Sequence, residues 1–229
     1  MTGEVISVSK TGYFVKIGDN THFCLINNSF KAADRPIVGD IVELKPHEDQ
    51  FLILDILPRR SFVSRYDEFK QKFQYFAANV DVVFIVTSAN REFSRVRLMR
   101  FLSLVGDQPI RPVVVVTKID EAKNFDILKN FQDIDAVAIN ALDAGDVKKL
   151  FKFWKAGETA LMLGTSGVGK STIINSLCGL GIKTRQSQSA RRQNKGRHTT
   201  SARTLYYLDD GRKIIDSPGV KIVSSGPEF

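Results

Sequence analysis

The stretch Thr159–Thr172, TALMLGTSGVGKST, decides the fold of this chain. It opens with an apolar run that is typical of a strand buried in a parallel sheet. The pattern G-x-x-x-x-G-K-[ST] follows, and the run IINSLCG after it suits a helix. A strand, a glycine-rich loop and a helix in this order predict a phosphate-binding loop. The alternative is a glycine-rich turn without a ligand. The loop comprises Gly164, Thr165, Ser166, Gly167, Val168, Gly169, Lys170, Ser171 and Thr172.

The residue types in this loop match the chemistry of phosphate binding. Gly164, Gly167 and Gly169 let successive backbone N–H groups point inward at phosphate oxygens. The positive end of the following helix points to the same place. Lys170 is then expected to bridge the terminal phosphates, and the Ser171 hydroxyl to bind Mg²⁺.

A second motif selects the base. Thr117, Lys118, Ile119 and Asp120 follow the apolar run RPVVVV and fit the pattern [NT]-K-x-D. The Asp120 carboxylate can accept hydrogen bonds from the N1–H and the exocyclic amine of guanine, a donor pair that adenine lacks. The aliphatic stem of Lys118 can lie along the base. The two motifs together predict a guanine nucleotide, with a P-loop ATPase as the alternative.

Two further stretches can complete a nucleotide site. In Asp216–Gly219, DSPG, a carboxylate at a strand end can hold a Mg²⁺-bound water. In Gly196–Thr200, GRHTT, hydroxyl groups can reach the Mg²⁺ and sense the γ-phosphate. The alternatives are an ordinary Pro-Gly turn for the first and a solvated basic loop for the second.

The pattern around these motifs predicts three parts. From residue 80 to 229, β-branched runs alternate with helical stretches, one of them capped by Ser94, which predicts an α/β domain with a mostly parallel sheet. Over residues 1–60, short β-prone runs separated by turn signals predict a small all-β barrel, either an OB-fold or an SH3-like barrel. Between them, over residues 61–79, the spacing of Phe69, Phe73 and Phe76 predicts a linker helix.

Composition narrows the class of protein. The net charge is +8 over 229 residues, and residues 183–203 carry seven basic and no acidic side chains. An anionic partner is therefore expected at that segment rather than at the barrel, where residues 1–60 carry seven basic and eight acidic groups. Two distant cysteines, Cys24 and Cys178, give no disulfide framework. No apolar run reaches the roughly 20 residues of a membrane span. We expect a cytoplasmic protein with no membrane partner.

The order of the motifs carries a family resemblance. TKID at 117 precedes the phosphate loop at 164, which precedes GRHTT and DSPG, so the domain is circularly permuted relative to most GTPases. A permuted P-loop GTPase domain behind a small barrel resembles the RsgA family (YjeQ, YloQ), GTPases of small ribosomal subunit biogenesis. The resemblance implies an OB-fold barrel that binds rRNA, hydrolysis of GTP with Mg²⁺ that the small subunit stimulates, and a role in late maturation of that subunit. We expect the protein to act as a monomer.

The resemblance also implies roles for single residues. Thr200 corresponds to the Mg²⁺-sensing threonine, and Asp216 to the carboxylate that holds Mg²⁺ through water. Asn140 and Ala141 stand where the family has Ser-Ala, whose backbone contacts the guanine oxygen. Val220 follows DSPG in place of the glutamine of many GTPases, so His198 becomes the candidate for orienting the attacking water. A merely solvated His198 is the alternative.

The end of the chain departs from the resemblance. Family members continue past DSPG into a helical domain that holds zinc through Cys and His, whereas this chain stops ten residues after Gly219. Cys24 and Cys178 are its only cysteines, so no zinc site is expected here. Either the chain is a short member, or it is shortened and SSGPEF comes from cloning. A further functional alternative is an RNA-binding chaperone that GTP merely switches.

Overall fold

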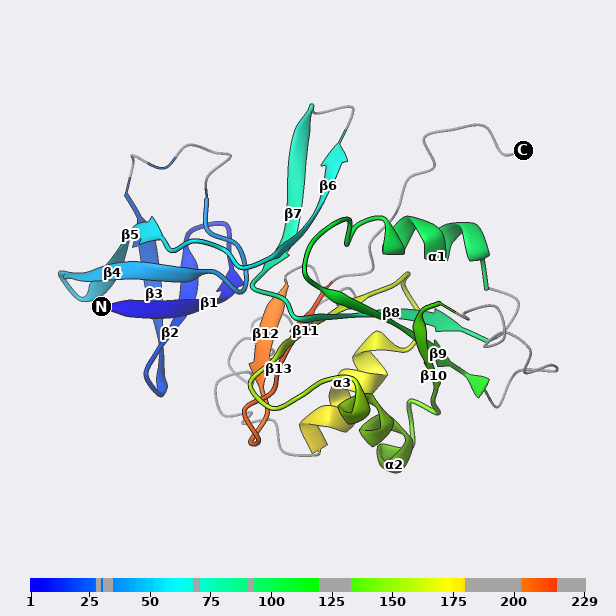
Figure 1. Ribbon diagram of the computed structural model, residues 1–229. Coiled ribbons are helices and arrows are strands. Elements are labelled where there is room, and N and C mark those ends of the chain that lie inside the picture. The colour runs from blue at the N-terminus through cyan, green and yellow to red at the C-terminus, as the bar shows by residue number, and fades with distance from the viewer. Residues whose placement is uncertain are drawn as a thin grey trace.

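A five-stranded barrel, a β-hairpin and an α/β domain follow one another in the computed structural model (Figure 1). The structure describes residues 1–27, 30, 35–67, 71–89, 93–119, 133–179 and 203–217. The strands are β1 Thr2–Val8, β2 Tyr13–Ile17, β3 Asn20–Ile26, β4 Ile41–His47, β5 Gln50–Ile56, β6 Phe62–Asp67, β7 Lys72–Ala78, β8 Val82–Ser88, β9 Arg111–Thr117, β10 Asp135–Ala138, β11 Thr159–Leu163, β12 Thr204–Tyr207 and β13 Lys213–Asp216. The helices are α1 Arg95–Leu102, α2 Ala144–Val147, the 3-10 helix η4 Lys148–Lys152 and α3 Lys170–Gly179.

The first five strands close on themselves. Their order is β1-β2-β3-β5-β4, and a β1–β4 pairing completes the ring. Strands β3 and β5 run parallel, while the other neighbours are antiparallel. Val5, Val15 and Ile53 are among the fully buried residues that fill the interior. The expected small barrel is confirmed, and its topology is OB-like.

The α/β domain is built on the strand order β10-β9-β8-β11-β13-β12. Five neighbouring strands, β10, β9, β8, β11 and β13, are mutually parallel, and β12 pairs antiparallel with β13. All carboxyl ends of the parallel strands therefore lie along one edge of the sheet, where loops can converge on a ligand. In the part of the chain described, no helix is both long and apolar enough to cross a membrane.

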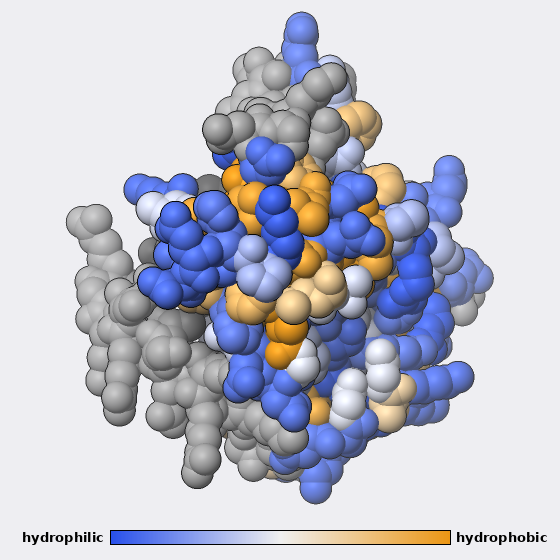
Figure 2. Space-filling view, turned by 90° about the vertical axis from the view of Figure 1, so that its left-hand side faces the viewer, coloured by the Kyte–Doolittle hydropathy of each residue, from blue (hydrophilic) through white to orange (hydrophobic). Residues whose placement is uncertain are grey.

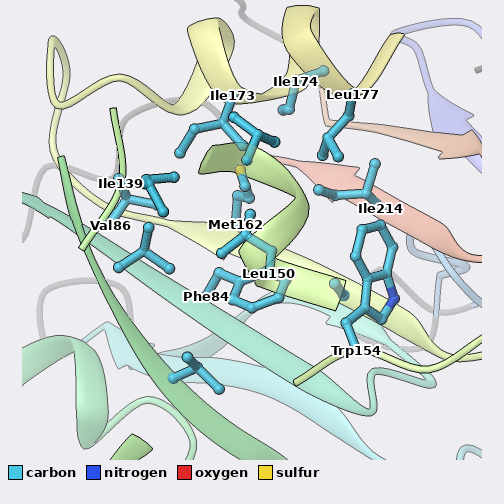
Figure 3. Close-up of a cluster of buried hydrophobic side chains, with 14 of the residues drawn as sticks. Phe84, Val86, Ile139, Leu150, Trp154, Met162, Ile173, Ile174, Leu177 and Ile214 are labelled. Carbon is cyan, nitrogen blue, oxygen red and sulfur yellow. The ribbon is translucent and has the colours of Figure 1, made fainter. Parts of the chain in front are cut away.

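Both faces of this sheet are covered. On one face, Phe84 and Met162 pack against Ile173 of α3 and against Trp154, which follows η4 (Figure 3). On the other face, which α1 covers in Figure 1, Leu161 and its neighbours belong to a buried cluster with residues of α1 and of the hairpin β6–β7. The side chain of Ser94 caps α1 by accepting a hydrogen bond from the Arg97 N–H, as predicted. Burial on both faces explains the continuous apolar runs in the sequence.

Residues 61–67 and 71–79 do not form the linker helix predicted from the spacing of Phe69, Phe73 and Phe76, and Phe69 itself lies outside the described residues. Strands β6 and β7 form an antiparallel hairpin in which Tyr66 faces Phe73, with ring centroids 5.3 Å apart. Phe73 is 58% exposed, whereas Phe76 is 2% exposed. In a strand, residues three apart point to opposite faces, so this spacing separates the two rings. The prediction was wrong because cross-strand aromatic pairing stabilises the hairpin instead.

Asp81 fastens the start of β8 to the start of β11. Its backbone N–H donates to the Thr159 carbonyl at 2.8 Å, and its carboxylate accepts from the Thr159 N–H at 2.8 Å and from Arg60 Nη1 at 2.6 Å. Burial acts to raise the pKa of Asp81, but the hydrogen bonds from Arg60 and Thr159 outweigh it, so this pKa lies below its usual value.

We predict that Asp81→Ala lowers the free energy of unfolding by about 1–3 kcal/mol at pH 7, because these hydrogen bonds are lost. The carboxyl pKa is lower in the folded than in the unfolded chain. Its contribution is therefore complete above the ordinary Asp pKa of about 3.9 and disappears as the pH falls through the folded value. Urea unfolding followed through the single tryptophan, Trp154, measures this at pH 7 and pH 3. The exposed Asp107→Ala is the control, and an equal deficit at both pH values would contradict the prediction.

Candidate functional site

The glycine-rich loop joins β11 to α3 at the carboxyl edge of the sheet, as predicted. Gly164 has φ 150°, and a Cβ placed on it would lie 2.4 Å from the Val86 carbonyl oxygen. Only glycine therefore lets the loop leave the strand this close to β8. Gly167 and Gly169 also have positive φ, at 82° and 102°. The residues of the motif thus form the curled backbone that phosphate binding requires.

Lys170 lies over this loop. Its Nζ donates to the carbonyl oxygens of Gly164 at 2.8 Å and Thr165 at 2.7 Å, and the residue is 6% exposed. Burial lowers the pKa of Lys170 to about 8, although the nearby Asp216 carboxylate raises it in part. Ser171, next along the helix, is exposed. A cation therefore sits at the mouth of the loop, close to where terminal phosphates would be bound.

Thr117 connects the second motif to the first. It ends β9, is fully buried, and its Oγ1 donates to the Val168 carbonyl oxygen at 2.6 Å. A Cβ on Gly169 would lie 3.5 Å from Thr117 Cγ2. Lys118 follows with φ 54°, a left-handed conformation that turns the chain out of the sheet, and Ile119 is half-buried. The start of TKID therefore lies directly against the phosphate loop.

Asn140 and Ala141 lie beyond β10 at the same edge. The Asn140 N–H donates to Asp146 Oδ2 at 2.8 Å, and its side-chain oxygen accepts from the Leu142 N–H at 3.0 Å. The Ser176 hydroxyl of α3 donates to the Ala141 carbonyl at 2.8 Å. The Asn140 side-chain oxygen is thus used within its own loop. The contact of the Asn140–Ala141 backbone with guanine stays a prediction.

Asp216 ends β13 at this edge and is 5% exposed. The neighbouring Ser217 hydroxyl donates to the Met162 carbonyl at 2.5 Å, which ties the end of β13 to β11. The Ser171 hydroxyl and the Asp216 carboxylate are oxygen donors of the kind that Mg²⁺ prefers, and they fit such an ion. Within the described ranges, no group of three or more His, Cys, Asp and Glu side chains could hold a metal by itself.

Several predicted residues lie outside the described residues: Asp120, His198, Thr200, Pro218, Gly219 and Val220, together with most of the basic segment 183–203. The side chain of Cys178 is likewise not described. Their proposed roles remain predictions.

Four side-chain contacts that support the site were not predicted from the sequence. Asp146 and Ser176 were missed altogether, and they hold the backbone of Asn140 and Ala141. Thr117 and Ser217 were named within TKID and DSPG, but the link of Thr117 to Val168 and the link of Ser217 to Met162 of β11 were not predicted. Thr117 and Ser217 are short polar side chains at strand ends, which was an available signal, whereas Asp146 and Ser176 lie on helices. The partner of each is fixed only by the fold, and the Thr117–Val168 pair is 51 residues apart.

We predict that Thr117→Val weakens binding of guanine nucleotide by about ten-fold, because the buried Val168 carbonyl loses its donor at a cost of about 1–3 kcal/mol. Titration with a fluorescent GDP derivative measures the effect. Thr117→Ser keeps the hydroxyl and is expected to bind like the original protein. Equal affinities for the Val and Ser variants would show that this hydrogen bond does not support the loop.

Comparison with known proteins agrees with this geometry. The family model described as RsgA GTPase matches residues 56–225. A small ribosomal subunit biogenesis GTPase RsgA from Mesorhizobium japonicum is 36% identical over 80% of this chain and 55% of the relative. RsgA 2 from Vibrio parahaemolyticus is 37% identical over 95% of this chain and 61% of the relative. The chain thus spans a little over half the length of these curated relatives.

Solved structures show the same fold. YjeQ from Thermotoga maritima superposes with a TM-score of 0.66 at 25% identity, covering 95% of this chain and 74% of YjeQ. YloQ, described as a circularly permuted GTPase, gives a TM-score of 0.62 at 22% identity, covering 98% and 73%. The fold is therefore shared over almost the whole chain, and the chain belongs to the RsgA GTPase family.

Proposed function

We propose that the chain binds GTP with Mg²⁺, hydrolyses it to GDP and phosphate, and acts in maturation of the small ribosomal subunit. The observation that carries this proposal is the contact between the phosphate loop and the TKID strand end through Thr117 and Val168. This contact fixes the glycine-rich loop to the end of β9, which supports the assignment of the loop to the phosphates and of TKID to the base. The names of the relatives support the biological role.

Phosphate binding requires Lys170 to exchange partners. Its ammonium now donates to the Gly164 and Thr165 carbonyls, and a triphosphate offers charged oxygens in their place. Ser171 would bind Mg²⁺ directly, and Asp216 through a water molecule. When bound, Mg²⁺ would neutralise part of the negative charge of the phosphates. Lys170 and the loop N–H groups hold the phosphates in place for the reaction.

Base recognition is assigned to Asp120, Lys118 and the backbone at Asn140 and Ala141. The left-handed Lys118 sends the chain outward at the edge where Ala141 also lies. A carboxylate at position 120 accepts from two guanine donors and would leave adenine without matching hydrogen bonds.

Hydrolysis needs a water in line with the bond that breaks. The water oxygen attacks the γ-phosphorus and one proton of this water moves to a phosphate oxygen. The bond from the phosphorus to the β–γ bridging oxygen breaks, GDP leaves with the electron pair, and inorganic phosphate is released. We assign His198 to orient this water and Thr200 to bind Mg²⁺ beside the γ-phosphate. Docking on the small subunit would complete the arrangement of these groups around the γ-phosphate, which makes the intrinsic rate slow and the stimulated rate fast.

RNA contact is assigned to two regions. On the face that Figure 2 shows, apolar side chains gather among hydrophilic ones. Leu25 of β3 and Leu54 of β5 are exposed large apolar residues of the barrel. The rings of Phe14 and Phe23 meet edge to face at 5.5 Å on β2 and β3. Residues 183–203 supply positive charge for phosphates. The protein would work as a monomer in the cytoplasm, where ribosomes are assembled.

We predict that Asp120→Asn changes base preference. GTP affinity falls at least about 100-fold, since the amide NH₂ cannot accept from guanine, while xanthosine triphosphate gains affinity because its 2-carbonyl accepts from that NH₂. A binding panel of GTP, XTP and ATP measures this, with the exposed Asp133→Asn as control. Tight ATP binding that survives Asp120→Ala would establish a P-loop ATPase instead.

We predict that His198→Ala lowers the subunit-stimulated kcat by about 100-fold with KM changed less than about two-fold, because water orientation matters only in the transition state. Phosphate release with purified small subunits is the assay, and the exposed His47→Ala on β4 is the control. An unchanged stimulated kcat would return His198 to a solvated role. Normal subunit release with a non-hydrolysable GTP analogue would favour a GTP-switched chaperone.

A further inference from the structure

The barrel contacts the α/β domain at strands β12 and β13, and β13 ends at Asp216 of the candidate site. Ser7 of β1 pairs with Thr204 of β12, which joins the barrel to the edge of the α/β sheet. Strand β12 pairs along its length with β13, and Thr204 lies opposite Asp216 in that ladder. One barrel strand is therefore adjacent to the strand pair that carries the Mg²⁺-binding carboxylate proposed above.

Glu4 is the centre of this contact. Its Oε1 lies 2.7 Å from Lys213 Nζ at the start of β13, and its Oε2 accepts from the Tyr207 hydroxyl of β12 at 2.5 Å. The side chains of Glu4 and Lys213 are only 11% and 19% exposed. Burial and the Glu4 carboxylate raise the pKa of Tyr207, so its hydroxyl keeps the proton that it donates. We call Glu4, Lys16, Tyr207 and Lys213 the Glu4 cluster.

Lys16 completes the cluster from the barrel side. It pairs with Glu4 across β1 and β2, and its Nζ lies 4.3 Å from the centre of the Tyr207 ring. Two residues of the barrel thus hold two residues of the α/β domain through an ion pair, a hydrogen bond and a cation–π contact. Loss of either partner of a largely buried ion pair leaves an uncompensated buried charge, so a movement that separates Glu4 from Lys213 costs free energy.

A second seam fixes the barrel at a different place. Ala78 N–H donates to the Val38 carbonyl at 3.0 Å, and Asn79 Nδ2 donates to the Gly39 carbonyl at 2.8 Å. A Cβ on Gly39 would lie 2.2 Å from the Ala78 carbonyl oxygen, so the two backbones are in tight contact. Because these contacts hold the barrel to the end of the hairpin, a rotation of the barrel about them would move β1 and so change the contacts of the Glu4 cluster.

We propose that the Glu4 cluster couples the barrel to the nucleotide site, by linking β1 through Lys213 and Tyr207 to β13 and thereby to Asp216. The inference rests on the proposed nucleotide binding. Lys213 and Asp216 are three residues apart on one extended strand, about 10 Å. Ser217, next in the chain, is fixed to Met162 of β11, the strand that enters the phosphate loop. RNA held by the barrel and nucleotide held at Asp216 therefore act on the same pair of strands, and the coupling is reciprocal.

Amide hydrogen exchange of the whole chain tests this without ribosomes. A non-hydrolysable GTP analogue with Mg²⁺ is expected to slow exchange at residues 164–179 in the original protein, in Glu4→Gln and in Glu43→Gln. It is expected to change exchange in β1 by at least about three-fold in the original protein and in Glu43→Gln, but not in Glu4→Gln. Gln keeps an acceptor for Tyr207 and removes the ion pair with Lys213. Glu43 is an exposed carboxylate on β4 and is the matched control.

A charge exchange separates coupling from folding. Glu4→Lys and Lys213→Glu are each expected to abolish the β1 response, and the double variant to restore at least about half of it. A β1 response that persists in Glu4→Gln would overturn the coupling, as would slowed exchange at 164–179 with no β1 response in the original protein. Lost slowing at 164–179 in Glu4→Gln, with a lowered melting temperature, would also overturn it in favour of a purely structural role. No slowing at 164–179 in the original protein would instead overturn the proposed nucleotide binding, and the coupling with it.

Discussion

The hydrogen bond from the Thr117 hydroxyl to the Val168 carbonyl sets the geometry on which the candidate site depends. Base and phosphates of a nucleotide are covalently joined, so the elements that bind them must keep a constant separation. Thr117 ends β9, and Val168 lies in the loop after β11, with β8 between the two strands. A buried side chain that reaches across that gap fixes the loop to the strand end. The close approach of Gly164 to Val86 holds the other side of the loop against β8.

How far the site could be predicted depends on whether its parts are contiguous in sequence. The phosphate loop and the start of TKID are local patterns, and the structure places both at the carboxyl ends of parallel strands, where they were expected. The supports are not local. Ser217 reaches Met162 across 55 positions, and Ser176 reaches Ala141 across 35. The sequence position of Ser217 or Ser176 does not predict its hydrogen-bond partner, because the partner depends on which elements become neighbours in the fold.

The fold shows the same division. Apolar runs and turn signals predicted the barrel strands and the buried strands of the sheet, since both depend on period and local chemistry. The hairpin was missed because three phenylalanines matched a helical spacing, while the pairing of Tyr66 with Phe73 can be recognised only once the turn is placed. Val147, Leu150 and Trp154 are all fully buried, although Val147 lies on the short helix α2, Leu150 on the 3-10 helix η4, and Trp154 after η4. A shared apolar face therefore does not determine helix type.

Circular permutation explains why the barrel lies where it does. The order β9-β8-β11-β13 in the sheet keeps the base strand, the phosphate loop and the Asp216 strand adjacent, although β11 and β13 come late in the chain. Strand β12 forms the edge of the α/β sheet, and β1, the first strand of the barrel, pairs with β12 at this edge. The first and last described parts of the chain thus meet through Glu4, Tyr207 and Lys213. The permuted order therefore brings the barrel into contact with β13, which carries the proposed Mg²⁺-binding carboxylate of Asp216. Strands β9 and β11, which lead into TKID and the glycine-rich loop, lie further inside the sheet.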